Sequence, residues 1–225
     1  MKPRALILTA ALLCSASAHA TISEAIGFEK KVDDAAAIIL GECVNTASRW
    51  DAAGKWIVTY STFRIEKSMK GEPAQEITVV TPGGVVNGIH QETIGVPKFA
   101  AGDDRVLFVK NTRVGPTVLY FDQGAYQVEK IRGERIVRPA VSAAVLVDTQ
   151  RGLAVAPEEP STLREFEERI SKRIRERREI ERMQVIERDK RAQASLGNVL
   201  KRNKTLVALA LIGAILATMQ LLKRW

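Results

Sequence analysis

The sequence predicts a mainly β domain, either a small antiparallel barrel or a sandwich, followed by a long charged helix and a C-terminal transmembrane helix. Three observations lead to this prediction. Between residues 36 and 137, short runs rich in β-branched and aromatic residues alternate with turn residues. Residues 163–202 are mostly strong helix formers and carry many charges. Residues 205–222 carry no charge at all.

The first twenty residues have the pattern of a secretory signal peptide. Lys2 and Arg4 precede an apolar stretch, and residues 18–20 (AHA) form a small-x-small cleavage site. Removal of residues 1–20 leaves Cys43 as the single cysteine, which cannot form an intramolecular disulfide. We therefore expect a domain held by its hydrophobic core, with Cys43 as a buried thiol.

The β runs are expected to form one domain over residues 21–156. The first two are predicted to pair as a hairpin around a turn at 51–54. A short helix or a loose lead-in precedes them over 24–35. The predicted strands are 36–46, 55–67, 76–81, 105–110, 117–121, 125–130 and 135–137.

A charged helical stalk is predicted over residues 157–204. Thr162 and Glu165 fit a capping box at its start. An apolar stripe of Leu163, Phe166, Ile170 and Ile174 would dock the first turns on the β domain, but the stripe then slips out of phase, which argues against a long coiled coil. Oppositely charged side chains such as Glu187 and Arg191 lie at i,i+4 and support the helix. Gly197-Asn198 is the expected break in the helix.

Residues 205–222 are predicted to cross a membrane. Eighteen residues at about 1.5 Å each give roughly 27 Å of helix, close to the hydrocarbon thickness. With the signal peptide, this span predicts a single-pass protein of the cytoplasmic (inner) membrane, with its main domain outside the cytoplasm and residues 223–225 as a cytoplasmic tail. The residues expected at the membrane interface are Lys201, Arg202, Lys204, Lys223, Arg224 and Trp225.

The net charge of +8 is not spread evenly along the chain. Residues 21–160 carry 16 basic and 18 acidic side chains, whereas residues 161–225 carry 16 basic and 8 acidic ones. The excess positive charge therefore lies in the stalk, where anionic lipid head groups are the expected partner. The β domain has no basic patch mixed with aromatic residues, which argues against nucleic acid.

A loop rich in glycine and proline, residues 82–99, connects two of the predicted strands. Its glycines are not followed by Gly-Lys-Ser/Thr or by a helix pattern, so a phosphate-binding loop is excluded. Asn87-Gly88 is typical of a tight turn. We expect a structural corner whose exposed residues can contact a partner: Gly83, Gly84, Asn87, Gly88, His90 and Phe99.

No catalytic motif such as G-x-S-x-G or H-E-x-x-H occurs in the sequence. A hydrolase that uses Cys43 and His90 requires the fold to bring them together, and Ser68 with Lys70 can be read as a dyad only by ignoring the turn that they occupy. We therefore expect neither an enzyme, nor a cofactor, nor a metal site.

Several motifs over residues 33–130 resemble a group of exported bacterial β-domains. They are DAAAIILGECV at 34–44, TFRI at 62–65 before MKG at 69–71, PGG at 82–84, GVPKF at 95–99, GD before VLFV at 106–109, and QGAYQV at 123–128. The strand order is also similar to the netrin-like OB-fold domain of tissue inhibitors of metalloproteinases. This resemblance implies an OB-like five-stranded barrel and a protease-facing role. The disulfide-tied N-terminal cysteine of those inhibitors is absent, so their mechanism is not carried over.

Together these observations predict a membrane-anchored extracytoplasmic binding module that recognises an envelope protein, a protease being the partner that the resemblance suggests. The alternative is a structural or assembly subunit that acts through the stalk and the transmembrane helix. Self-association into a homo-oligomer belongs to this second hypothesis.

Overall fold

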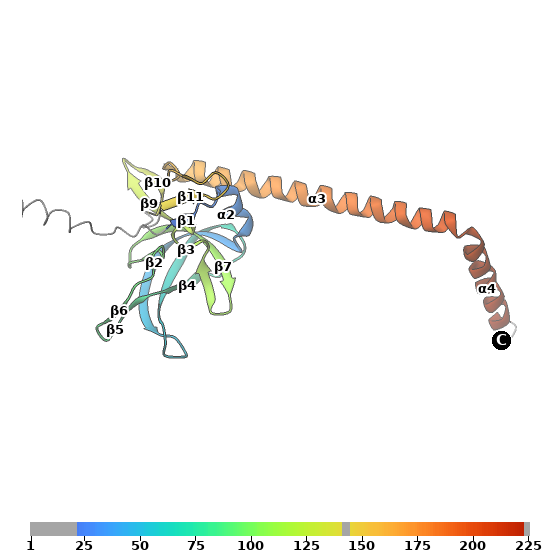
Figure 1. The fold of residues 1–225 in the computed structure, drawn as a ribbon, viewed down its shortest axis with the longest axis horizontal. Coiled ribbons are helices and arrows are strands. Elements are labelled where there is room, and N and C mark those ends of the chain that lie inside the picture. Colours follow the sequence, from blue (N-terminus) through green and yellow to red (C-terminus); the bar gives the residue numbers. More distant parts are fainter. Residues whose placement is uncertain (1–21, 141–144, 223–225) are drawn as a thin grey trace, which may run out of the picture. The chain divides into compact units, whose positions relative to one another are not determined.

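The computed structural model describes residues 22–140 and 145–222, and Figure 1 shows their ribbon. The predicted signal peptide (1–20) and tail (223–225) lie outside the described residues. The chain divides into two compact units, one through Arg173 and one from Ile174. The first unit contains the β domain together with the first turns of the long helix α3 (Leu163–Arg202).

The largest sheet contains eight strands in the order β13-β10-β9-β7-β2-β3-β4, with β8 paired to β7. The predicted hairpin is confirmed, because β2 and β3 pair antiparallel around residues 51–56. Six of the seven predicted strands are confirmed with shifted ends, whereas the predicted strand 117–121 overlaps β8 only at residues 117–118 before the chain turns into a 3₁₀ helix. The eight strands of this sheet are β2 (Ala37–Trp50), β3 (Ile57–Lys70), β4 (Glu76–Pro82), β7 (Asp104–Thr112), β8 (Gly115–Val118), β9 (Ala125–Ile131), β10 (Glu134–Pro139) and β13 (Ser161–Thr162), of which β13 was not predicted.

A single antiparallel barrel does not describe the domain fully, because two further sheets are present. The N-terminal β1 (Ile22–Glu24) pairs parallel with β11 (Val145–Asp148), which also pairs with β12 (Leu153–Ala154). Loop 82–99 contains a small hairpin of β5 (Gly84–Val86) and β6 (Ile89–Gln91). The main sheet still curls, since β4 at its edge contacts β8. After β8, the chain turns into the short 3₁₀ helix η1 (Phe121–Gly124).

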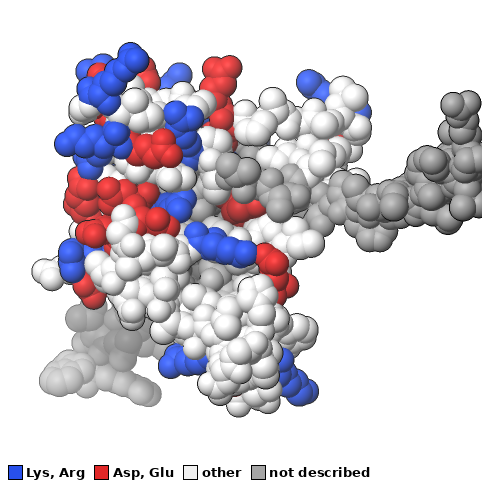
Figure 2. Space-filling view, turned by 90° about the vertical axis from the view of Figure 1, so that its left-hand side faces the viewer, with Lys and Arg blue, Asp and Glu red and all other residues white. Residues whose placement is uncertain are grey.

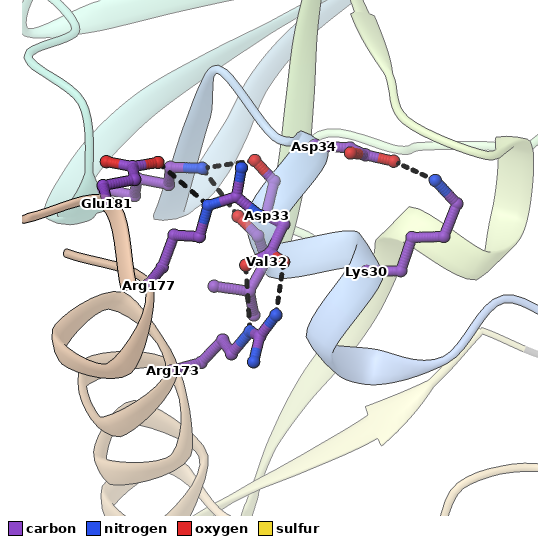
Figure 3. Close-up of polar contacts among 8 residues, drawn as sticks. Lys30, Val32, Asp33, Asp34, Arg173, Arg177 and Glu181 are labelled. Atoms are coloured by element: carbon purple, nitrogen blue, oxygen red, sulfur yellow. Dashed lines mark hydrogen bonds and ion pairs between the residues drawn. The ribbon is translucent and has the colours of Figure 1, made fainter. Parts of the chain in front are cut away.

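The hydrophobic core lies between the curled sheet and two helices. Over residues 24–35, where the sequence predicted either a short helix or a loose lead-in, the helix α2 (Phe28–Asp34) forms. The predicted docking of the stalk is confirmed: Phe166 packs edge-on against the rings of Phe28 and Tyr126, and Ile170 is fully buried. Figure 3 shows Arg173 reaching the carboxylate of Asp33, with Nε 2.9 Å from Oδ1. The first turns of α3 are therefore part of the β domain.

The start of α3 agrees with the sequence, whereas its predicted break does not. The Glu165 amide donates to Thr162 Oγ1 at 3.2 Å, and the Thr162 amide donates to Glu165 Oε2 at 3.0 Å, which is the predicted capping box. The helix continues through Gly197 to Arg202 and ends before Asn203. A single glycine costs an exposed helix only about 1 kcal/mol, so strong helix formers on both sides carry the helix past it.

The prediction of a transmembrane helix is wrong. Residues 204–222 form the helix α4 (Lys204–Leu222), but within 22–140 and 145–222 no helix combines the length and the apolar character needed to cross a membrane. Its 19 residues measure roughly 28 Å, but Lys204, two threonines and Gln220 reduce its apolar character. The predicted fold class is wrong on this point, and so is the localisation as a single-pass membrane protein. Of the residues expected at a membrane interface, Lys201 and Arg202 end α3, Lys204 begins α4, and the others lie outside the described residues.

Candidate functional site

One end of the β domain carries hydroxyl side chains on the face that is apolar elsewhere. Along β3, Ile57 and Phe63 are fully buried, and Thr59 and Ser61 lie between them at the same two-residue spacing. The register places Ser48 opposite Thr59 and Thr46 opposite Ser61 on β2, and Thr81 opposite Thr59 on β4. Residues directly opposite in an antiparallel pair share a face. Five hydroxyls from three strands therefore converge, and we call them the hydroxyl face: Thr46, Ser48, Thr59, Ser61 and Thr81.

Hydrogen bonds hold loop 82–99 on this face. The Gly83 amide donates to the Ile57 carbonyl at 2.8 Å, and the Ile57 amide donates to Gln91 Oε1 at 2.8 Å. Thr59 Oγ1 donates to the Gly83 carbonyl at 2.7 Å. Since Thr59 uses its one proton there, Ser48 Oγ must donate to Thr59 Oγ1, which lies 2.8 Å away. Both ends of the β5–β6 hairpin are thereby fixed.

A cleft of about 280 Å³ lies between the hydroxyl face and the loop. All five hydroxyl residues line it. Of the predicted loop residues, Gly83, Gly84, His90 and Phe99 also line it. Phe99 is held by an edge-on contact with Phe63, with 5.0 Å between the ring centroids. Asn87 and Gly88 instead form the turn between β5 and β6, both with positive φ, and do not line the cleft.

Ser61 is the buried polar group of this cleft. Its side chain is 1% exposed, and among the described residues its Oγ has no hydrogen-bond partner. A buried hydroxyl without a partner is uncommon and requires an explanation. The sequence contains a signal for Ser61, because residues 59 and 61 are polar at core-facing positions of a predicted strand. The candidate site was instead predicted from the loop alone.

The charges around the cleft lie at its rim and cancel. Lys98 Nζ lies 2.5 Å from Glu92 Oε1, and both side chains are largely exposed. The hydrogen bond from Lys98 holds the pKa of Glu92 below its usual range. Apart from Lys98, Glu92 and His90, the residues that line the cleft have no ionisable side chain.

Large apolar side chains are exposed at the same end of the domain. Trp56 in the turn between β2 and β3 is 61% exposed, and Val85, Ile89 and Ile94 are each more than half exposed. Val85 and Ile89 lie on opposite faces of the β5–β6 hairpin. In the view of Figure 2, charged side chains gather on the upper part of the domain, and its lower end is mostly uncharged. We call Trp56, Val85, Ile89 and Ile94 the apolar rim.

The turn that presents Trp56 is well ordered by its own hydrogen bonds. Asp51 Oδ1 accepts from the amides of Lys55 at 2.7 Å and Trp56 at 3.1 Å, and the Asp51 amide donates to the Trp56 carbonyl. These bonds, from Trp56 first, hold the pKa of Asp51 below its usual value. The exposed indole is thus displayed on a fixed turn.

Cys43 and His90 do not form a common site. Cys43 is fully buried in the core, as expected, and its Sγ contacts the carbonyl of Asn45 at 3.7 Å. Burial raises the pKa of this thiol, which disfavours the nucleophilic thiolate. His90 is exposed on β6 and lines the cleft. A search of the described residues finds no group of three or more His, Cys, Asp or Glu side chains placed to hold a metal ion.

The Ser68 and Lys70 pair has a structural role. Lys70 Nζ donates to the carbonyls of Val32 at 2.6 Å and Asp33 at 2.9 Å, near the end of α2. Ser68 Oγ donates to the carbonyl of Gly71 at 2.9 Å. Because carbonyl groups at a helix C-terminus lack partners within the helix, Lys70 caps α2.

A larger cleft of about 980 Å³ lies beside α2, next to the buried Lys31. Lys31 Nζ donates to Glu158 Oε1, to the Tyr126 hydroxyl and to the Gln123 carbonyl. An ammonium group has three donors, so all are used within the fold. Burial lowers the pKa of Lys31, opposed by the Glu158 carboxylate. This cluster ties α2 to the segment that precedes α3.

Comparisons with models of protein families, with curated proteins and with solved structures found no match. The resemblance to netrin-like domains consequently stays a prediction.

Proposed function

We propose that the β domain is a protein-binding module that holds its partner at the end formed by the apolar rim and loop 82–99. The observation that carries the proposal is the apolar rim itself: four large apolar side chains, each more than half exposed, on a turn and a loop fixed by hydrogen bonds. Exposed apolar groups on a rigid support are typical of interaction sites, and tryptophan is enriched among residues that dominate binding energy.

Rigidity supports this proposal because ordering a loop on binding costs free energy. The Asp51 turn and the bonds from Gly83 and Gln91 hold the site in place before any partner arrives. The rim side chains then lose little backbone freedom when they are covered.

The test is capture of partner proteins by the immobilised full chain. Trp56→Ala combined with Ile89→Asn should abolish retention of the specific partner, with unchanged far-UV circular dichroism. Val114→Asn is the matched control, since Val114 is also exposed (71%) but lies in the β7–β8 turn. Metalloproteases belong among the candidates tested, because the netrin-like resemblance suggests them. A partner retained equally by all three proteins would refute the proposed surface.

A second candidate function is assembly through the helix α3. Ile180, Met183 and Ile186 repeat every three residues along its second part, and each is about half exposed or more. Such a stripe suits contact with a second copy of the chain. Sedimentation equilibrium of the full chain should then show an oligomer that Met183→Lys dissociates. A monomer at all concentrations would exclude this function.

A further inference from the structure

The hydroxyl-lined cleft contains a buried polar group without a partner. Ser61 lines the cleft and is almost completely buried, and its Oγ has no partner within the described residues. Thr46 and Thr81 line the same cleft. Leaving such a group unpaired costs free energy, which a ligand that hydrogen-bonds to it would recover. The cleft is therefore prepared for a group that can donate or accept hydrogen bonds.

The dimensions of the cleft restrict that group to a small one. Its volume of about 280 Å³ lies at or below the range of ordinary small-molecule sites, roughly 300–1,000 Å³, and suits one side chain better than a cofactor. Phe99 adds an apolar ring to a lining that is otherwise rich in hydroxyls.

The polarity of the cleft selects an uncharged group. The floor offers hydroxyls without a counter-ion, and the two rim charges, Lys98 and Glu92, already neutralise each other. An ionised side chain would lose its hydration there without a charged partner. An amide provides two donors and one acceptor, and serine and threonine hydroxyls can accept from it and donate to it.

We propose that the cleft receives the amide side chain of an asparagine or glutamine from the protein partner, with apolar residues on either side of that amide covering the apolar rim. The two sites are adjacent, because Val85 belongs to the apolar rim and also lines the cleft. This inference rests on the proposed function. It goes further by assigning the recognition chemistry: the rim supplies contact area, and the cleft selects one residue type.

Ser61→Ala separates this role from a structural one. Removing an unpaired buried hydroxyl leaves no partner behind, so the midpoint of urea unfolding should stay the same or rise. Binding of the amide should weaken at the same time. A side chain that merely supported the fold would instead lower the midpoint.

The experiment selects linear peptides from a phage-displayed random library on the immobilised full chain. The enriched peptides should share one Asn or Gln flanked by apolar residues. Replacing that residue by Asp or Glu, or by Leu, in a fluorescent copy should lower affinity about 3- to 10-fold in anisotropy measurements, and Ser61→Ala should do the same. Thr62→Ala is the matched control, because Thr62 lies next to Ser61 in β3 but on the opposite face, where it bonds Thr78 at 2.9 Å; it should bind like wild type.

The outcomes distinguish the two proposals. Enriched peptides that lack an amide, or that bind Ser61→Ala as well as wild type, would overturn this inference while leaving the binding module in place, provided that Trp56→Ala still weakens them. If no peptide is enriched on the wild-type chain, or if Trp56→Ala has no effect on any of them, the proposed function fails and this inference fails with it.

Discussion

Gly84→Ala tests whether loop 82–99 is seated on the hydroxyl face as the structure shows. A Cβ atom at position 84 would lie 2.4 Å from Ser48 Oγ and 2.6 Å from Thr59 Oγ1, closer than real Cβ contacts allow. Gly84 also has a φ of +140°, which residues with a Cβ rarely adopt. The alanine chain can relieve the clash only by lifting the hairpin or by moving both hydroxyls.

The size of the effect follows from these two contributions. Forcing an alanine into this conformation costs about 1–3 kcal/mol. Losing one or two of the hydrogen bonds at Thr59, each worth about 0.5–1.5 kcal/mol, brings the expected loss to about 1.5–6 kcal/mol. Gly88→Ala is the matched control: its φ is also positive, at +78°, but among the described residues no atom lies within 4 Å of its Cβ position. It should cost only about 1–2 kcal/mol.

The assay is urea denaturation of both variants, followed by far-UV circular dichroism, with hydrogen exchange to locate the change. The Gly83 amide, bonded to the Ile57 carbonyl, should exchange faster in Gly84→Ala and not in Gly88→Ala. Equal losses of stability in the two variants would refute the close approach of the loop to the hydroxyl face.

Three further predictions concern the core, the thiol and pH. Phe166→Ala should lower the free energy of unfolding by about 3–5 kcal/mol because it removes a ring packed against three others, whereas the exposed Met183→Ala in the same helix should change it by less than about 0.5 kcal/mol in urea titrations. The Cys43 thiol should resist a disulfide reagent in the native protein and react fully in urea; rapid native labelling would contradict its burial. Although partial burial raises it, the hydrogen bonds from Arg105 and from the Ala100 amide hold the pKa of Asp103 below its ordinary 3.8. The contribution of Asp103 to stability is therefore complete above pH 3.8 and is lost as the pH falls through the lower pKa of the folded state. Asp103→Asn should flatten that part of a plot of urea midpoint against pH. An unchanged slope would exclude this role.

Local patterns were enough to predict most of the elements. The alternation and composition of the β runs predicted six strands and part of β8, because residues two apart in a strand share an environment. The capping box at Thr162 and the docking stripe with Phe166 and Ile170 were also readable, since both depend on neighbours within one turn or two. The transmembrane prediction failed because the length and the absence of charge over 205–222 were taken as sufficient, although uncharged polar residues also decide whether a helix can span.

Other features depended on contacts between residues far apart in the chain. The parallel pairing of β1 with β11 has no local signature, because each strand is short and is defined by the other. Loop 82–99 could be recognised as a corner from its glycines and prolines, but its role depends on which face it covers. The residues of β3 alone show that polar side chains occupy its alternate positions 59 and 61. Their meeting with hydroxyls of two other strands depends on the fold, since strand register brings β2, β3 and β4 to one cleft; the residues that meet are Thr46, Ser48, Thr59, Ser61 and Thr81.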